Sequence, residues 1–326
     1  MLNSNFLSHN PKCWVLTDGK AGMESQCIAL ADTLGLKPTL KRVSIRSPWA
    51  FLPPHLWIFP LKALSVKSDK LEPPWPDILI ATGTKTVALA LSIKTINPAT
   101  FLIQIQNPTM SISKFDIVIA PKHDCLSASN VVSTLGALNS INKRKLNDAF
   151  TEFASDYLGL PKPLIGVLIG GNNKNFHLTQ KRTENFAMML REAVNNIGGS
   201  LAITPSRRTS ENSLKIIKNT LSDIPKFIWN GSGKNPYLGI LAHADYFIVT
   251  GDSVNMVSEA IATGKPVHVF KDFGGSKKFD RFHNSLEKLG VTRPFSGRIE
   301  KWEYEIIDEM TLVADAVKKA WNFSKN

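Results

Sequence analysis

The stretch that decides the fold is residues 244–260, ADYFIVTGDSVNMVSEA. Its run Phe247–Val249 is short, apolar and β-prone, which is typical of a buried parallel strand. Asp252 or Ser253 is a natural helix N-cap, and Gly264 would stop the helix that follows. A polar turn between a strand end and a helix start presents free backbone N–H groups and the positive end of the helix dipole, which can bind a phosphate. The stretch therefore predicts either a phosphate site or an ordinary strand–turn–helix unit.

Composition and charge are those of a globular protein. The chain has 326 residues, which suits two domains of roughly 150 residues each. Its net charge of +12 comes from scattered basic pairs without interleaved aromatic residues, so nucleic acid is not an expected partner. The three cysteines lack metal-ligand spacing and are expected to be reduced thiols. Residues 1–10 lack a signal-peptide core and no apolar run suits a membrane span, so we expect a cytoplasmic protein, at most peripheral at the inner face of the membrane.

Strand, loop and helix alternate along the chain, and this alternation predicts an α/β fold with two Rossmann-like domains facing a cleft. The region 150–163, with Gly159 and two prolines, is the best boundary. We therefore expect an N-terminal domain over residues 1–155, a C-terminal domain over 156–303 and a final helix within 304–326. The predicted strands are Cys13–Thr17, Thr39–Val43, Asp77–Gly83, Thr100–Gln106 and Asp116–Ala120, then Lys162–Ile169, Ser200–Thr204, Lys226–Trp229, Phe247–Val249 and Pro266–Phe270.

Several catalytic signatures are absent from the sequence. Gly231-x-Gly233 lacks the third glycine of a dinucleotide fingerprint, and Gly264-Lys265 precedes Pro266, so it is not a P-loop. The sequence contains no Asp-x-Asp pair, no metal-ligand cluster and no Gly-x-Ser-x-Gly elbow. These observations disfavour nucleoside triphosphatases, nicotinamide enzymes and metallohydrolases, and we expect neither a metal nor a cofactor.

Polar loops follow four predicted strands of the second half at their carboxyl ends, where open α/β sheets bind ligands. Their residue types suit a phosphate-bearing ligand such as a nucleotide: glycines allow close backbone approach, arginine forks match phosphate oxygens, aromatic rings stack on a base, and a carboxylate can accept hydrogen bonds from a ribose. Each signal alone is equally typical of an ordinary turn. The candidates for close approach are Gly170, Gly171 and Asn172, those for phosphate are Ser206, Arg207 and Arg208, and those for the base are Trp229 and Tyr237. The helix start adds Asp252, Ser253, Asn255 and Met256, and Glu259 is the candidate for the ribose.

The segment Pro48–Leu64 is apolar but broken by four prolines. Trp49 and Trp57 on a basic background would suit a surface patch that dips into lipid headgroups. A short helix and loop packed on the core would give the same sequence. The segment therefore predicts either contact with an anionic membrane surface, through residues Trp49–Leu64, or ordinary packing.

The chain resembles the plant mitochondrial-fission "elongated mitochondria" proteins and their bacterial relatives. The resemblance runs from about Trp14 to Trp321, although this chain has Met23 where many bacterial relatives carry histidine. The motifs that carry it are Thr17–Gln26, Gln106-Asn107-Pro108, Phe115-Asp116, Pro121–Asp124, Gly170-Gly171, Thr204–Thr209 and Thr250–Ser253.

That family is similar in turn to GT-B glycosyltransferases, with the peptidoglycan N-acetylglucosaminyltransferase as a comparison. The resemblance implies a nucleotide-sugar donor on the C-terminal domain, with Ser253–Met256 at its diphosphate and Glu259 at its ribose. It also implies a metal-independent reaction, and a final helix, about Tyr304–Phe323, that crosses back to the N-terminal domain. The acceptor would then face the first loop, where Asp18 and Glu24 are the candidate general bases.

Two functions remain open at this point. The first is a metal-independent glycosyltransferase that acts on a membrane-linked or cell-envelope acceptor. The second is a non-catalytic GT-B-like scaffold that recruits protein partners to a membrane, as the resemblance to the fission proteins implies.

Overall fold

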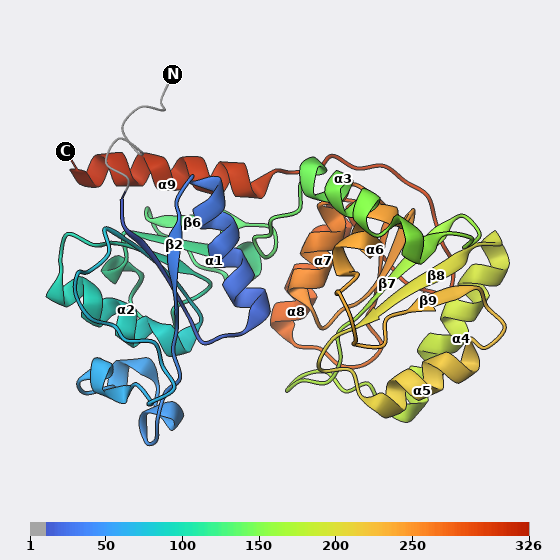
Figure 1. The fold of residues 1–326 in the computed structure, drawn as a ribbon, viewed down its shortest axis with the longest axis horizontal. Coiled ribbons are helices and arrows are strands. Elements are labelled where there is room, and N and C mark those ends of the chain that lie inside the picture. The colour runs from blue at the N-terminus through green and yellow to red at the C-terminus, as the bar shows by residue number, and fades with distance from the viewer. Residues whose placement is uncertain (1–10, 326) are drawn as a thin grey trace. The chain divides into compact units, whose positions relative to one another are not determined.

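The computed structural model describes residues 11–325, which form two compact units (Figure 1). The first unit comprises the chain up to Ser140 together with the segment from Asp308 onward, and the second comprises Ile141–Ile307. Residues 1–10, on which the expectation about a signal peptide rests, lie outside the described part. No helix in the described part is long and apolar enough to cross a membrane.

The first unit is a parallel sheet with helices on both faces. Among the described residues its strand order is β2-β1-β3-β4-β5-β6, and every pair is parallel. The strands are β1 (Cys13–Thr17), β2 (Pro38–Arg42), β3 (Ile78–Thr82), β4 (Phe101–Ile105), β5 (Ile117–Pro121) and β6 (Val131–Thr134). The helices are α1 (Ala21–Thr33), α2 (Thr84–Ile96) and α9 (Glu309–Lys325).

Alternation along each strand builds two cores in this unit, because successive side chains point to opposite faces of a sheet. Cys13 and Val15 of β1 join the core beneath α1 and α9, whereas Trp14 and Leu16 join the core beneath α2. Helix α9 contributes buried side chains to the first of these cores, including Trp321. The last helix of the chain therefore packs on the first unit.

The second unit repeats this architecture. Among the described residues its strand order is β12-β11-β10-β7-β8-β9, again with every pair parallel. The strands are β7 (Leu164–Ile169), β8 (Ser200–Pro205), β9 (Lys226–Ile228), β10 (Tyr246–Thr250), β11 (Val267–Phe270) and β12 (Thr292–Pro294). The helices are α3 (Lys143–Glu152), α4 (Gln180–Ile197), α5 (Glu211–Thr220), α6 (Tyr237–His243), α7 (Val254–Ile261) and α8 (Lys277–Lys288).

The predicted fold class, α/β with two Rossmann-like domains of parallel sheet, is confirmed. Two strands were not predicted, β6 and β12; both are short edge strands without a continuous buried run. The last helix begins at Glu309 rather than Tyr304. Tyr304 lies in a segment without regular secondary structure, and its hydroxyl donates to the carbonyl oxygens of Ile261 and Lys265, each at 2.9 Å. The first unit ends at Ser140, upstream of the expected boundary, because α3 packs against α6 of the second unit.

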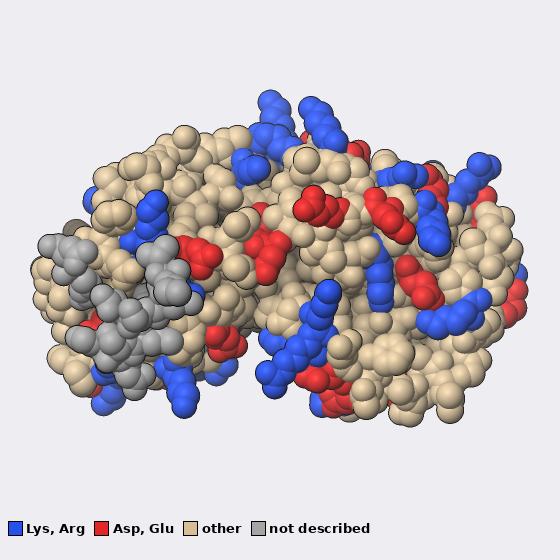
Figure 2. Space-filling model, turned by 90° about the horizontal axis from the view of Figure 1, so that it is seen from above, with Lys and Arg blue, Asp and Glu red and all other residues tan. Residues whose placement is uncertain are grey.

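The positive charge is spread over the surface. Figure 2 shows lysine and arginine side chains intermingled with aspartate and glutamate on the face that it displays. Ion pairs link residues of opposite charge at many places within the described part of the chain. The observed distribution agrees with the scattered basic pairs of the sequence.

Candidate functional site

The order of strands in the second unit creates a topological switch point. The chain leaves β7 toward β8 on one side, while β10 lies on the other side of β7. Ligands of open α/β sheets bind at the carboxyl ends of the strands beside such a point. The loops after β7, β8, β9 and β10 follow the carboxyl ends of four adjacent strands, so the sheet brings all four predicted loops to one edge.

Glycine is required at both positions that follow β7. A Cβ atom on Gly170 would lie 2.1 Å from Oδ1 of Asp252, and one on Gly171 would lie 2.3 Å from the backbone oxygen of Arg208. Gly171 also has φ +142°, a conformation that side chains disfavour. The two glycines therefore allow a close approach of other parts of the chain, and the predicted approach of a ligand stays a prediction.

A buried carboxylate ties three of the loops together. Oδ2 of Asp252 accepts hydrogen bonds from the Gly171 amide at 3.0 Å and pairs with Nη1 of Arg208 at 2.7 Å. Oδ1 accepts from the Thr250 hydroxyl at 2.7 Å, and that hydroxyl accepts from the Gly170 amide at 2.7 Å. Burial raises the pKa of Asp252, while Arg208 and the hydrogen bonds oppose the rise. Asp252, proposed from sequence as part of the helix terminus, thus holds the loops in place.

The two arginines after β8 differ in their environment. Arg208 pairs with Asp252 and donates to the Gly171 carbonyl oxygen at 3.2 Å. Arg207 is exposed and makes no hydrogen bond or ion pair within residues 11–325. Of the predicted arginine clamp, only Arg207 has its guanidinium free for an anion.

The remaining polar candidates shape the loops or begin α7. Asn172 accepts a hydrogen bond from the Leu178 amide at 2.7 Å, and the Ser206 hydroxyl donates to the Gly170 carbonyl oxygen. Ser253 is the N-cap of α7, since its hydroxyl accepts from the Met256 amide at 3.3 Å. Asn255 and Met256 lie, partly exposed, in the first turn of this helix. The helix start is thus formed as the sequence predicted, with its positive dipole end at the switch point.

Glu259 lies on α7 and is engaged by a residue of α6. The Tyr237 hydroxyl donates a hydrogen bond of 2.5 Å to Oε2 of Glu259. Burial raises the pKa of Glu259 to about 7, although this hydrogen bond opposes the rise. Tyr237, considered from sequence as a stacking face for a base, orients the carboxylate through its hydroxyl, and its stacking role stays a prediction. A carboxylate that is half protonated near neutral pH can change its charge when a hydroxyl-bearing ligand arrives.

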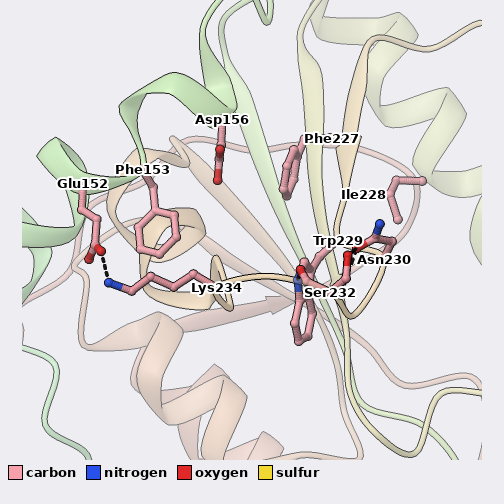
Figure 3. A pocket seen from close by; sticks show the side chains of 9 residues that line it. All are labelled: Glu152, Phe153, Asp156, Phe227, Ile228, Trp229, Asn230, Ser232 and Lys234. Carbon is pink, nitrogen blue, oxygen red and sulfur yellow. Dashed lines mark hydrogen bonds and ion pairs between the residues drawn. The ribbon is translucent and has the colours of Figure 1, made fainter.

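A pocket of about 440 Å³ opens beside the end of β9 (Figure 3). Trp229 contributes to its wall and donates its indole N–H to the Ser232 carbonyl oxygen at 3.0 Å. Lys234 pairs with Glu152 of α3 across the pocket, as the dashed line in Figure 3 marks. The lining residues are Glu152, Phe153, Asp156, Phe227, Ile228, Trp229, Asn230, Ser232 and Lys234. A planar group could lie against the aromatic side chains there.

The two candidate bases lie in the first unit, and each is paired with a cation. Asp18 follows β1, and its Oδ2 lies 2.8 Å from Nζ of Lys20. Glu24 lies on α1 and accepts two hydrogen bonds from Arg42, at 2.9 and 2.7 Å. Bidentate pairing occupies both carboxylate oxygens of Glu24, whereas the lysine beside Asp18 is well exposed and can move away.

Sequence reasoning missed several participants. Thr250 and Thr209 bridge the loops through their hydroxyls, with Thr209 donating to the Gly170 carbonyl oxygen at 2.6 Å. Both lie within the motifs that carry the family resemblance, which was the available signal. Arg42, the partner of Glu24, was not among the candidates, and the pairing of β1 with β2 sets it opposite Thr17. Among residues 11–325, no three or more His, Cys, Asp or Glu side chains gather into a metal-binding group.

Solved structures of other proteins share the fold of this chain. The UDP-GlcNAc 2-epimerase of Methanocaldococcus jannaschii is 12% identical, with a TM-score of 0.56 and 93% of this chain and 91% of that one covered. MurG of Acinetobacter baumannii is 11% identical, with a TM-score of 0.51 and coverages of 96% and 93%. At such low identity the likeness shows the fold alone, which is that of GT-B glycosyltransferases.

The sequence comparisons show the family to which the chain belongs. The family model described as Mitochondrial fission ELM1 matches residues 21–321, so the chain belongs to this family. The Mitochondrial fission protein ELM1 of Arabidopsis thaliana is 29% identical, over 96% of this chain and 92% of that protein. The resemblance proposed from the sequence motifs is therefore confirmed.

Proposed function

We propose that the second unit binds the nucleoside diphosphate of a nucleotide sugar at the switch point between β7 and β10. The observation that carries the proposal is the fixed set of loops around Asp252, which presents the start of α7 and the free guanidinium of Arg207 at one edge of the sheet. A helix N-terminus and an arginine fork are both suited to phosphate oxygens. One fold neighbour is a UDP-GlcNAc 2-epimerase, an enzyme named after a nucleotide sugar, and this likeness supports the ligand class.

The ribose and the base have partners of their own in this proposal. Glu259 accepts hydrogen bonds from the ribose hydroxyls while Tyr237 holds its carboxylate, and the base lies beside Trp229. The remaining site residues, Gly170, Gly171, Asn172, Ser206, Ser253, Asn255 and Met256, shape the loops against the sugar and the diphosphate.

The reaction that fits this ligand is transfer of the sugar to a membrane-linked or envelope acceptor. The acceptor hydroxyl oxygen attacks the anomeric carbon, the bond from that carbon to the diphosphate breaks, and the diphosphate departs with the electron pair. A base of the first unit accepts the hydroxyl proton. Asp18 is favoured over Glu24, because Lys20 is more readily displaced than the bidentate Arg42. Arg207 and the helix start stabilise the leaving diphosphate, and no metal ion is required.

Calorimetric titration tests this proposal. UDP, GDP, CMP, ADP and UDP-GlcNAc are titrated into the protein, with and without EDTA. One nucleotide should bind, and Arg207→Ala and Glu259→Ala should each weaken it by about tenfold, the effect of losing one charged hydrogen bond. Lys218→Ala, an exposed lysine of α5, serves as the control and should bind like the wild type. If no nucleotide binds at millimolar concentration, the proposal fails.

A second candidate function is favoured by one observation. Both carboxylates considered as bases are ion-paired, as is Arg208, so the chain could retain the architecture without the chemistry. A non-catalytic scaffold that recruits protein partners to a membrane, as in the mitochondrial-fission relatives, would show this pattern. Sugar transfer that is lost in Asp18→Asn would exclude the scaffold as the whole function.

A further inference from the structure

A group of large apolar side chains is exposed on the first unit, far along the chain from the candidate nucleotide site. Each member of the group is between 40% and 85% exposed. The group, here called the apolar tip, consists of Phe51, Leu52, Leu56, Ile58 and Phe59. In Figure 1 this segment is the light-blue projection below α2. Single exposed apolar residues are ordinary, but a contiguous set of this size marks an interaction surface.

The tip is held in shape by its own backbone and by two tryptophans that point inward. Short 3₁₀ turns over Trp49–Phe51, Pro54–Leu56 and Pro60–Ala63 build it, and the last two pack against α2. The Trp57 indole is buried in the core under α2 and donates to the Leu52 carbonyl oxygen at 3.0 Å.

Trp49 donates in the same way to the carbonyl oxygen of Ile58 at 3.2 Å. The sequence suggested that these two indoles would dip into a headgroup layer, and the structure corrects this. The tryptophans brace the backbone, and phenylalanine, leucine and isoleucine side chains are presented outward instead.

The backbone supports this outward presentation. Phe59 has φ +51° and ψ +64°, a left-handed conformation that is unfavourable for a phenylalanine and persists only where the surrounding structure enforces it. The Phe59 ring lies 5.1 Å from Nζ of Lys62 and remains mostly exposed. The chain therefore maintains a strained turn that leaves an aromatic ring in solvent.

Cations flank the tip in the sequence, and Lys62 lies beside its Phe59 ring. Residues 44–70 contain four lysines and arginines against a single acidic residue, Asp69, whose carboxylate already accepts a hydrogen bond from the Arg42 amide at 2.7 Å. The Arg46 guanidinium lies 5.2 Å from the Trp49 ring. The four cations are Arg46, Lys62, Lys67 and Lys70.

We propose that the apolar tip inserts into the headgroup region of an anionic lipid bilayer, with Arg46 and Lys62 against the lipid phosphates. Apolar side chains flanked by lysine and arginine are the pattern by which peripheral segments bind such surfaces. Interfaces with proteins favour exposed tryptophan and tyrosine anchors, whereas here both tryptophans of the segment turn inward. The inference goes beyond the proposed nucleotide site and does not depend on it.

Vesicle flotation tests the proposal. The full chain is mixed with vesicles of phosphatidylcholine containing phosphatidylglycerol, or of phosphatidylcholine alone. The wild type should float with the anionic vesicles. The double variant Phe51→Ser, Phe59→Ser should partition about tenfold or more weakly, because each substitution removes an apolar ring that the membrane would bury. The matched control is Leu158→Ser, an equally exposed apolar residue of the second unit. It should float like the wild type.

A second set of variants tests the electrostatic contribution to membrane binding. Arg46→Glu with Lys62→Glu should lower partitioning, and added salt should lower it further in the wild type. Lys215→Glu, an exposed lysine of α5, is the control. All variants replace exposed side chains, so unchanged circular dichroism and unchanged nucleotide titrations are expected.

Three results would overturn the proposal. The first is a wild type that does not float with anionic vesicles, and the second is tip variants that float as well as the wild type. The third is a dimer in gel filtration that Phe51→Ser dissociates, which would make the tip a contact between two copies of the chain. A failed nucleotide titration would leave this proposal standing, so the two proposals fail separately.

Discussion

The two sheets have similar architecture but stabilise the loops at their switch points by different means. In the second unit a fully buried carboxylate, Asp252, connects the loops after β7, β8 and β10. In the first unit, the polar residues after β1 form pairs with cations that are largely exposed to solvent. Buried networks are rigid and costly to break, whereas exposed ion pairs contribute little and rearrange readily. The loops of the second unit are thus held in place, whereas the residues after β1 in the first unit can rearrange.

The largest expected effect comes from removing the buried carboxylate. Asp252→Ala leaves the Gly171 amide, the Thr250 hydroxyl and Arg208 without their partner, and should lower the free energy of unfolding by about 3 kcal/mol, the low end for a broken buried pair because Arg208 is partly exposed. Urea denaturation followed by circular dichroism measures the loss. A loss below about 1 kcal/mol would mean that the network is dispensable and that the site is not preformed.

The next effect concerns backbone packing in the same loops. Gly171→Ala would force a Cβ against the backbone of Arg208 and should destabilise the protein by about 2 kcal/mol or more. Gly159→Ala is the matched control, because Gly159 also has a positive φ but has no atom within 4 Å of the added Cβ. It should cost only about 1 kcal/mol of backbone strain. Equal losses in the two variants would contradict the tight contact between the loops.

The pH dependence of ligand binding should reveal the state of Glu259. Its pKa of about 7 means that the ionised form, which accepts hydrogen bonds from ribose hydroxyls, becomes dominant only above neutral pH. The affinity for the bound nucleotide should therefore rise as the pH increases from 6 to 8, by up to about tenfold. In Tyr237→Phe the hydrogen bond that lowers this pKa is gone, so the midpoint of the rise should move to higher pH. Calorimetric titrations at several pH values measure both.

Stability should follow the opposite trend at this residue. The pKa of Glu259 in the folded state lies above the ordinary glutamate value of 4.5, so the folded state retains the proton between about pH 4.5 and 7. Stability therefore falls as the pH rises through this window. Glu259→Gln should remove its share of that fall, about 1–2 kcal/mol after allowance for partial exposure to solvent. An unchanged pH profile in Glu259→Gln would show that the carboxylate titrates normally.

The smallest expected effect lies in the first unit. Asp18→Asn removes the pairing with an exposed lysine and should change the free energy of unfolding by no more than about 0.5 kcal/mol. The measurement is the same urea denaturation used for Asp252→Ala. A loss comparable with that of the buried carboxylate would contradict the contrast between a fixed and an adjustable switch point.

The sequence predicted those strands, turns and helices that depend on neighbouring residues. The buried run Phe247–Val249, the N-cap Ser253 and the stop at Gly264 set a strand, a turn and a helix through neighbouring residues, and all three are found. The edge strands β6 and β12 were missed because edge strands lack a continuous buried run. The strand periodicity was thus sufficient for the fold class.

Partners distant in the sequence could not be predicted. Nothing near Asp252 indicates that it meets Gly171 and Arg208, since the sheet alone brings these residues together. The inward direction of Trp49 and Trp57 also depends on the packing of their segment on α2. The sequence therefore identified the loops of the candidate site but not the contacts that its residues make with one another.

Hydrogen–deuterium exchange with and without UDP tests the central claim most directly. If the preformed loops of the second unit hold the nucleotide, amides of residues 170–172, 206–209 and 253–257 should exchange more slowly in its presence, while those of residues 17–24 should be unchanged. Protection confined to residues 17–24, or no protection anywhere at saturating nucleotide, would contradict the account.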